Sequence, residues 1–253
     1  MGRINIGVIG VGNCFAGLVQ GIEYYRQNVD KRIVGLMHEK IGGYSVFDLN
    51  FTSAFDVGEN KIGKALHEAI YQAPNRVDWL PRVPRINTVV REGPILDGVG
   101  VYVEKMIKPI KQTKSDSELK RDVIREIRDT ETEMLLNFLP VGSERAVKFW
   151  AQVCLDAEVG IVNCMPVFIA SDKSWAKRFE EKSLPVIGDD IKSQVGATIL
   201  HRVLAKLLDD RGATIDQTYQ INVAGNTDFA NMLEHSRLVS KKISKTEAVQ
   251  SQL

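Results

Sequence analysis

The chain has 253 residues, of which 33 are Lys or Arg and 32 are Asp or Glu, so its formal net charge is +1 at pH 7. A chain of this length buries a proper core and fits one large α/β domain, or a dinucleotide-binding domain with a smaller partner domain. The near balance of charge excludes a basic field over the whole surface, so we expect a small-molecule ligand and neither nucleic acid nor a membrane as partner.

Three cysteines, Cys14, Cys154 and Cys164, lack the number and spacing of a disulfide framework or a metal site. They predict reduced thiols, most simply buried apolar ones. The amino terminus runs directly into a strand without the pattern of a signal peptide, and no window reaches the ~18 uninterrupted apolar residues of a membrane span. We therefore expect a cytoplasmic protein.

A strand, a turn and a helix follow one another at the start of the chain. The run INIGVI at residues 4–9 predicts a buried parallel strand that ends in a glycine turn. Apolar residues at i, i+3, i+4 and i+7 then predict a helix whose sheet-facing side carries Phe15, Leu18, Val19 and Ile22. Residues 32–37 and 44–51 predict an inserted hairpin or loop, and residues 52–57 predict a short strand.

The middle of the chain alternates strands with helices. Residues 72–114 hold five of the eight prolines and predict an excursion from the sheet. Ser115 stands three residues before Glu118, a capping-box spacing, and begins a charged helix with one apolar face. A buried strand at 134–139, a helix begun by Ser143 and a strand at 160–164 follow. This alternation predicts right-handed βαβ units in a doubly wound parallel sheet.

The character of the sequence changes near Gly188. We place a boundary there, between a Rossmann-like α/β domain over residues 1–188 and the start of an α+β domain over residues 189–253. Leucines and a valine at helical spacing over 200–207 predict a helix that ends near Gly212, and TYQINV at 218–223 predicts a strand. The tail after residue 240 is polar.

The first strand-to-helix junction is the best candidate for a nucleotide site. Gly7, Gly10 and Gly12 resemble the dinucleotide fingerprint, but Phe15 replaces the third glycine, which predicts a variant approach of helix to sheet. A pyrophosphate can approach the backbone at such a turn and meet the positive end of the helix. A tight turn that serves only the fold is the alternative.

Asp56 ends the second predicted strand of the sheet. A carboxylate at that point can accept both ribose hydroxyls and reject a 2′-phosphate, so Asp56 favours NAD over NADP. It lies beyond the usual ~20 residues after the glycines, a gap that the inserted residues explain. A plain surface aspartate is the alternative.

Two polar clusters follow strands in the carboxyl half. Residues 189–193, DDIKS, lie at the edge where open α/β sheets bind ligands and could order a sugar, a ribose or a cation; a solvated turn is the alternative. Asn222, Asn226 and Asp228 surround a turn that could hydrogen-bond a polyol, although the same residue types make ordinary turns.

Lys241 and Lys245 stack on one face if their segment is helical, where like charges repel and an anion such as phosphate relieves the repulsion. A solvated basic face is the alternative. The four histidines show no metal-ligand pairing, and neither G-x-S-x-G nor H-E-x-x-H occurs. The sequence therefore argues against a classical hydrolase or a zinc enzyme.

The chain as a whole resembles the inositol-3-phosphate synthase (1L-myo-inositol-1-phosphate synthase) family, notably its shorter prokaryotic branch. In the carboxyl half the resemblance rests on LPVGSERAVKFWA, GIVNCMPVFIAS, LPVIGDDIKSQVGAT, TYQINVAGNTDF and RLVSKKISKTEAV. In the amino half it rests on GVIGVGNCFAGLVQGIEYY, SAFDV and GPILDGVG. It implies an isomerase that uses bound NAD as a transient oxidant on D-glucose 6-phosphate. Hydride leaves C5, a C6 proton is removed, the enolate closes on the C1 aldehyde, and the hydride returns.

The resemblance also assigns residues. The lysines of the family's S-K-x-I-S-K motif fall on Lys241 and Lys245, for acid/base work and for holding phosphate or an oxyanion. The implied catalytic residues are Lys241, Lys245, Asp190, Asn222, Asn226 and Asp228. The implied cofactor-binding residues are Gly10, Gly12, Asn13, Cys14, Asp56, Ser143, Asp190 and Ser193.

The family further implies a cytoplasmic homotetramer in inositol and phospholipid biosynthesis, with a metal cation near the cofactor in some members. Its members continue past S-K-x-I-S-K through more strands of the catalytic, tetramer-forming domain, so we expect this chain to be truncated and that domain to be incomplete. A two-domain NAD-dependent dehydrogenase and a non-catalytic NAD-binding protein are the alternatives.

Overall fold

The computed structural model describes residues 2–29, 34–78, 80–191, 193 and 195–253. Its centre is a six-stranded sheet in the order β3-β2-β1-β4-β5-β6, in which every neighbouring pair is parallel. The strands are β1 (Ile4–Ile9), β2 (Leu49–Asp56), β3 (Val90–Glu92), β4 (Met134–Asn137), β5 (Gly160–Asn163) and β6 (Val186–Ile187). This is the doubly wound order, whose direction of winding reverses between β1 and β4, and it confirms the predicted Rossmann-like class.

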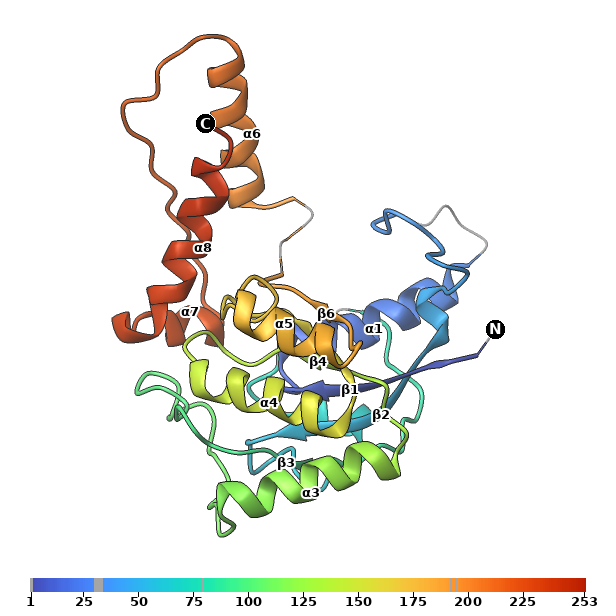
Figure 1. The fold of residues 1–253 in the computed structure, drawn as a ribbon. Coiled ribbons are helices and arrows are strands. Elements are labelled where there is room, and N and C mark those ends of the chain that lie inside the picture. The colour runs from blue at the N-terminus through green and yellow to red at the C-terminus, as the bar shows by residue number, and fades with distance from the viewer. Residues whose placement is uncertain (1, 30–33, 79, 192, 194) are drawn as a thin grey trace.

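Helices cover both faces of the sheet (Figure 1). Successive strand residues point to opposite faces, so Val8 joins a core with α1 (Asn13–Gln27) and α2 (Leu66–Ala69). Its neighbour Ile9 joins a second core with residues of the helices on the other face, which are α3 (Asp116–Asp129), α4 (Glu144–Ala157) and α5 (Lys173–Glu181). The sheet is therefore buried on both sides, as its continuous apolar strands predict.

Helix α3 begins as its capping box predicts. The Ser115 hydroxyl accepts the Glu118 N–H at 3.3 Å, and the Glu118 carboxylate accepts the Ser115 N–H at 2.9 Å. Helix α4 begins directly after Ser143, but the Ser143 side chain makes no capping hydrogen bond. The positions of both helices are confirmed, and the capping interaction of Ser143 is not formed.

Two predictions for the first half of the sheet were wrong in part. No hairpin forms in the described residues of 34–51, which hold an isolated bridge, a short 3-10 helix η1 (Val46–Asp48) and the first residues of β2. Residues 49–51 form strand rather than loop because they pair with β1. Residues 32 and 33 lie outside the described ranges. The excursion 72–114 contains the edge strand β3, which pairs with the end of β2 and buries Val90 completely.

The carboxyl-terminal elements rise from the sheet as an arm, drawn in orange to red in Figure 1. They are α6 (Ala197–Asp210), α7 (Thr227–Met232), the 3-10 helix η2 (His235–Leu238) and α8 (Val239–Gln250), and α6 contacts α8. The polar tail is thus helical, which puts Lys241 and Lys245 on one helix. The domain boundary near Gly188 stays a prediction.

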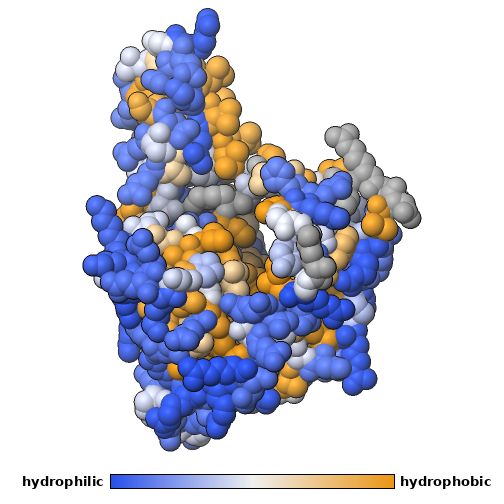
Figure 2. Space-filling view, turned by 45° about the vertical axis from the view of Figure 1, so that its right-hand side comes forward, coloured by the Kyte–Doolittle hydropathy of each residue, from blue (hydrophilic) through white to orange (hydrophobic). Residues whose placement is uncertain are grey.

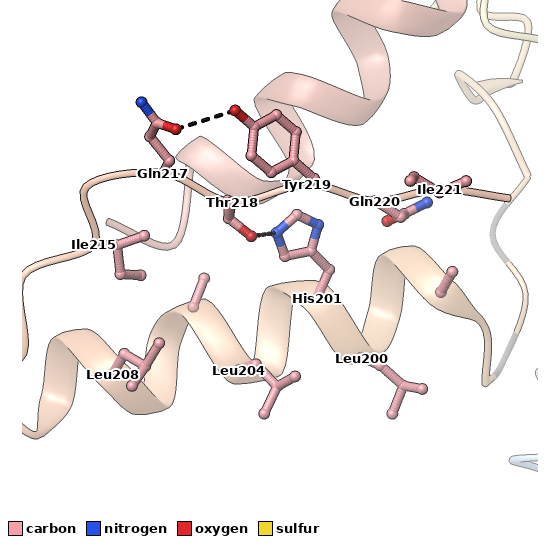
Figure 3. A pocket seen from close by; sticks show the side chains of 12 residues that line it. Leu200, His201, Leu204, Leu208, Ile215, Gln217, Thr218, Tyr219, Gln220 and Ile221 are labelled. Carbon is pink, nitrogen blue, oxygen red and sulfur yellow. Dashed lines mark hydrogen bonds between the residues drawn. The ribbon is translucent and has the colours of Figure 1, made fainter.

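The predicted strand at 218–223 is not formed. The segment runs along α6, and no strand among the described residues pairs with it, so its backbone has no ladder to join there. Ile221 and Val223 are 86% and 92% exposed. Figure 3 shows this segment beside α6, where His201 points to it and its ring nitrogen lies 2.7 Å from the Thr218 hydroxyl oxygen. These residues line a hollow of about 440 Å³.

Helix α6 forms as predicted, but its apolar face is uncovered. Figure 2 shows hydrophobic surface along one side of the arm, and the exposed apolar residues of α6 are Leu200, Val203, Leu204, Leu207 and Leu208. Leu200 and Leu204 point away from the 215–221 segment in Figure 3. None of the helices in the described part of the chain has the length and apolar character that crossing a bilayer requires.

Candidate active site

A cavity of about 540 Å³ lies at the carboxyl ends of β1 and β4, the switch point of the sheet where open α/β folds bind ligands. Loops from the sheet form one side of its wall and the arm forms the other. The predicted site residues that line it are Gly12, Asn13, Cys14, Asp56, Asp190, Ser193, Asn222, Asn226, Asp228, Lys241 and Lys245. Gly10 and Ser143 are not among its lining residues.

The glycine turn leaves room for a phosphate group. Gly10 has φ +87°, and a Cβ there would lie 2.8 Å from the carbonyl oxygen of Phe138, so only glycine fits. The space above Gly12 is open, because a Cβ built there meets no atom within 4 Å. The first turn of α1 carries no acidic residue, so the positive end of the helix is available to an anion.

Phe15, which replaces the third glycine, is fully buried in the core. Its ring packs edge-on against Phe51 with centroids 5.1 Å apart, and it also contacts the ring of Phe138. The side chain therefore fills the space between helix and sheet that a glycine would leave for close approach. These contacts are compatible with the predicted variant approach of helix to sheet, which stays a prediction.

Asp56 holds the glycine turn in place. Its Oδ2 accepts the Val11 N–H at 2.8 Å, while its Oδ1 accepts the N–H groups of Val57 and Gly58, each at 2.8 Å. A carboxylate offers about four acceptor positions, so capacity for a ribose hydroxyl is left. Asp56 also lines the cavity, which is the position that the NAD prediction requires.

Lys61 and Asn75 complete this support, and the sequence analysis missed both. Lys61 is 5% exposed, and its ammonium donates to the Val11 carbonyl at 2.7 Å and to the Asn75 amide oxygen at 3.1 Å. Asn75 donates to the same Val11 carbonyl at 3.0 Å. Burial lowers the pKa of Lys61, and Asp56, 3.9 Å away, opposes that shift. The peptide groups of Val11 are thus bound on both sides.

Buried amides at the ends of β4 and β5 orient the next loop. Asn137 donates to Asn163 at 2.9 Å, and Asn163 donates to the Asp189 carboxylate at 2.7 Å. Asp189 also accepts the backbone N–H of Ile169 at 2.9 Å, so its charge serves the fold. Of the adjacent carboxylates, Asp190 is the one that lines the cavity.

The arm brings its cationic residues to the same cavity. Lys241 donates to the Asp228 carboxylate at 3.2 Å, and its side chain is 17% exposed. Ser244 donates to the Asp190 carboxylate at 3.0 Å, and Lys245 lines the cavity from the same helix. Ammonium, carboxylate and hydroxyl groups therefore meet in one chamber, which suits a phosphorylated polyol.

The two predicted amides of the arm, Asn222 and Asn226, lie at the cavity. Asn226 caps α7, because its side-chain oxygen accepts the Phe229 N–H at 3.0 Å, and Asn222 lines the cavity before it. Among the described residues, no group of three or more His, Cys, Asp or Glu side chains is placed to hold a metal ion.

The cysteines are unpaired thiols, as predicted, and Cys154 and Cys164 are buried. Cys14 is exposed, so the prediction of a buried apolar thiol was wrong there, because this residue lies at the open end of the glycine turn. Although the residue is exposed, the surrounding walls of the cavity partly desolvate the Cys14 thiol, which raises its pKa; Asp228 acts in the same direction, against Lys241. Burial, with Cys14 and Asp190 nearby, raises the pKa of Cys164 to about 11. Both thiols are therefore poor nucleophiles at neutral pH.

Comparison with known proteins identifies the family. The model of the myo-inositol-1-phosphate synthase family matches residues 196–253. An inositol-3-phosphate synthase of Mycolicibacterium smegmatis is 53% identical over 254 residues, which cover 100% of this chain and 68% of that protein. The chain belongs to the inositol-3-phosphate synthase family. Inositol-3-phosphate synthases of Mycobacterium tuberculosis and Corynebacterium glutamicum are 50% and 47% identical, over 99% of this chain and 67% and 68% of their own lengths.

Solved structures agree on the fold. The crystal structure of Ari2 superposes with a TM-score of 0.78 at 30% identity, covering 98% of this chain and 68% of that one. A myo-inositol-1-phosphate synthase-related protein from Thermotoga maritima gives a TM-score of 0.77 at 22% identity, over 99% and 70% of the two chains. Both likenesses span nearly the whole chain, the arm included, so the arm belongs to a fold that these two proteins share.

Membership in the inositol-3-phosphate synthase family gives the S-K-x-I-S-K match its context. Its two lysines, Lys241 and Lys245, lie on the side of α8 that faces the cavity. Ser143 is 4% exposed and directly precedes α4, and it does not line the cavity. The assignments of individual residues to cofactor and substrate stay predictions.

Proposed function

We propose that this chain carries out the family's reaction, the redox-neutral conversion of D-glucose 6-phosphate to 1L-myo-inositol 1-phosphate with NAD. One observation carries the proposal: the open end of the glycine turn and the two lysines of α8 line a single cavity. A dehydrogenase needs the first feature and one acid/base group, for which a single lysine suffices. An aldol ring closure also needs cations near an enolate and an oxyanion, which Lys241 and Lys245 supply.

The residues present fit NAD. The open space above Gly12 and the N-terminus of α1 would hold the pyrophosphate, and Asp56 would accept a ribose hydroxyl. NAD, when bound, supplies a hydride acceptor that returns the hydride before product leaves. Val11 is fixed by Asp56 and Lys61, so the turn is in place before the cofactor arrives.

The residues of the arm act on the sugar phosphate. Lys241 and Lys245 bind the phosphate or the oxyanion and move the proton, while Asp228 orients the Lys241 ammonium through its 3.2 Å contact. Asp190, Asn222 and Asn226 hydrogen-bond hydroxyl groups of the substrate. The mixture of charges around the chamber keeps the anionic substrate close without a net field over the whole surface.

The test is incubation of the chain with glucose 6-phosphate and NAD, with phosphorus NMR to follow inositol phosphate and absorbance to follow NADH. We expect product without net NADH and a loss of ~100-fold or more in kcat for Lys241→Met. Lys206→Met is the matched control, because Lys206 pairs with Asp210 on the surface of α6. Stoichiometric NADH would favour a dehydrogenase, and NAD binding without turnover would favour a non-catalytic protein.

We also infer a homotetramer in the cytoplasm that supplies inositol for phospholipid synthesis. The exposed apolar face of α6 supports assembly, since exposed apolar patches of this kind mark interaction sites. The three unpaired cysteines support a reducing compartment. Sedimentation at several concentrations tests the assembly, and a monomer at all of them would refute it.

A further inference from the structure

We propose that Arg237 and Asn231 form a clamp that couples the turn after β4, on the nucleotide side of the cavity, to the lysine helix α8. The inference rests on the proposed function, because it assumes that NAD and a sugar phosphate share this cavity. Both are positioning residues, which act through the backbone that they hold. Their expected effect is cooperativity between the two ligands.

The clamp consists of three hydrogen bonds from the arm to backbone carbonyls. The Arg237 Nε donates to the Val141 carbonyl at 3.2 Å, and its Nη1 donates to the Asp97 carbonyl at 3.0 Å. Asn231 Nδ2 donates to the same Val141 carbonyl at 2.7 Å. Arg237 and Asn231 are 6% and 2% exposed, so these bonds are shielded from water.

Gly142 allows this close approach. Its φ is +86°, and a Cβ built on it would lie 2.5 Å from the Cβ of Arg237 and 2.9 Å from its Cα. The arm thus rests directly on the backbone of the turn, with no side chain between them. Any larger residue at this position must displace Arg237.

Through the clamp, a movement of the turn after β4 displaces the lysines of α8. Val141 lines the cavity, so a ligand at the switch point contacts the residue that the clamp holds. Arg237 lies in η2, which runs directly into α8, and Lys241 follows it by one helical turn. A shift of Arg237 therefore shifts Lys241 and its partner Asp228.

A third segment is tied to the same point. The Asp97 carboxylate accepts the N–H groups of Arg145 and Ala146, at 3.1 and 2.8 Å, where α4 begins. Glu234, on the arm, accepts the Val101 N–H at 3.1 Å. The loop around residues 97–101 consequently joins the start of α4 to the arm. Its hydrogen bonds to both hold in place the Asp97 carbonyl to which Arg237 donates.

The energetics favour a functional reason for the clamp. No ion pair of the described residues includes Arg237, and two of the clamp's buried polar atoms, Arg237 Nη2 and Asn231 Oδ1, lack a hydrogen-bond partner there. A buried cation without a carboxylate is costly, and apolar side chains of similar volume would hold the two parts together more stably. Unlike apolar side chains, the guanidinium fixes the position of the Val141 carbonyl through a directional hydrogen bond.

The experiment measures cooperativity by calorimetry. D-Glucitol 6-phosphate, which lacks the aldehyde on which the ring closes, is titrated into the chain with and without NAD. We expect wild-type affinity to rise ~10-fold or more with NAD, and this factor to fall at least ~5-fold in Arg237→Met and Gly142→Ala. Arg237→Lys retains part of it because the ammonium can still reach a carbonyl.

Gly212→Ala is the matched control for backbone strain, since Gly212 has φ +72° and no atom within 4 Å of a built Cβ, and it should keep the wild-type factor. A wild-type factor in folded Arg237→Met or Gly142→Ala, or no cooperativity in the wild type, would overturn the clamp. A wild-type chain that binds no NAD would instead refute the proposed function.

Discussion

Asp56→Asn tests both the structural role of this residue and its role in binding the cofactor. The amide keeps one oxygen for the N–H groups of Val57 and Gly58 but turns an NH2 toward the Val11 N–H, so the 2.8 Å bond to Val11 is lost. A hydrogen bond to a charged group contributes about 1.5–3 kcal/mol. At 2–4 °C per kcal/mol for a chain of this size, the melting temperature should fall by about 3–12 °C.

Cofactor affinity should fall as well. The turn loses its fixed shape and the ribose loses an anionic acceptor, so we expect the Kd for NAD to rise ~10-fold or more, equivalent to about 1.4 kcal/mol. Calorimetric titration measures the Kd and scanning calorimetry measures the melting temperature. Glu59→Gln is the control: its side chain is 52% exposed and pairs with Lys108, so neither quantity should move appreciably. Unchanged melting and unchanged affinity in Asp56→Asn would refute the reasoning.

Three further predictions concern single residues. Gly10→Ala should destabilise the fold by about 1–3 kcal/mol in urea unfolding, because the new Cβ meets the Phe138 carbonyl at 2.8 Å and the backbone has φ +87°. Ser115→Ala should remove about 1 kcal/mol by loss of the α3 cap, also measured in urea. The Cys14 thiol has a pKa raised from its ordinary 9.0, so its thiolate forms, and alkylation accelerates, only as pH rises through a midpoint above 9.0.

Each of these has a matched comparison. Gly212→Ala shares the positive φ without the close contact, and equal losses at both glycines would contradict the steric argument. Ser117→Ala removes a hydroxyl that bonds the Ser115 hydroxyl at 3.2 Å but leaves the bond from the Glu118 N–H to Ser115 in place, so it should cost less stability than Ser115→Ala. NAD should protect Cys14 from alkylation; rapid alkylation at neutral pH, or none of that protection, would contradict its place in the cavity.

The local sequence pattern alone predicted the helices that bury one apolar stripe and the strands that consist of one apolar run. Helix α3 followed from its capping box and apolar face, and β1 from its apolar run before the glycine turn. Strand β3 was missed because it is a three-residue edge strand in a proline-rich segment, and pairing with β2 decides its conformation. The 218–223 run has strand composition, but no strand in the described part of the chain pairs with it.

The candidate site divides in the same way. Glycines and acids at strand ends could be predicted, because the carboxyl edge of a parallel sheet is where ligands bind. Lys61, Asn75 and Arg237 could not, since each binds a backbone carbonyl far away in the chain. Arg237 and Val141 are 96 residues apart, and a carbonyl acceptor leaves no mark in the sequence. Only the folded chain brings these donors to the turns that they hold.

The fate of the C5 hydrogen tests the central claim most directly. Glucose 6-phosphate labelled with deuterium at C5 is incubated with the chain and NAD, and the inositol phosphate is analysed by mass spectrometry. If the cavity recycles its oxidant, the deuterium returns to the ring and the product keeps the label, with none in free NADH. Label that accumulates in NADH, or an absence of inositol phosphate, would contradict the account.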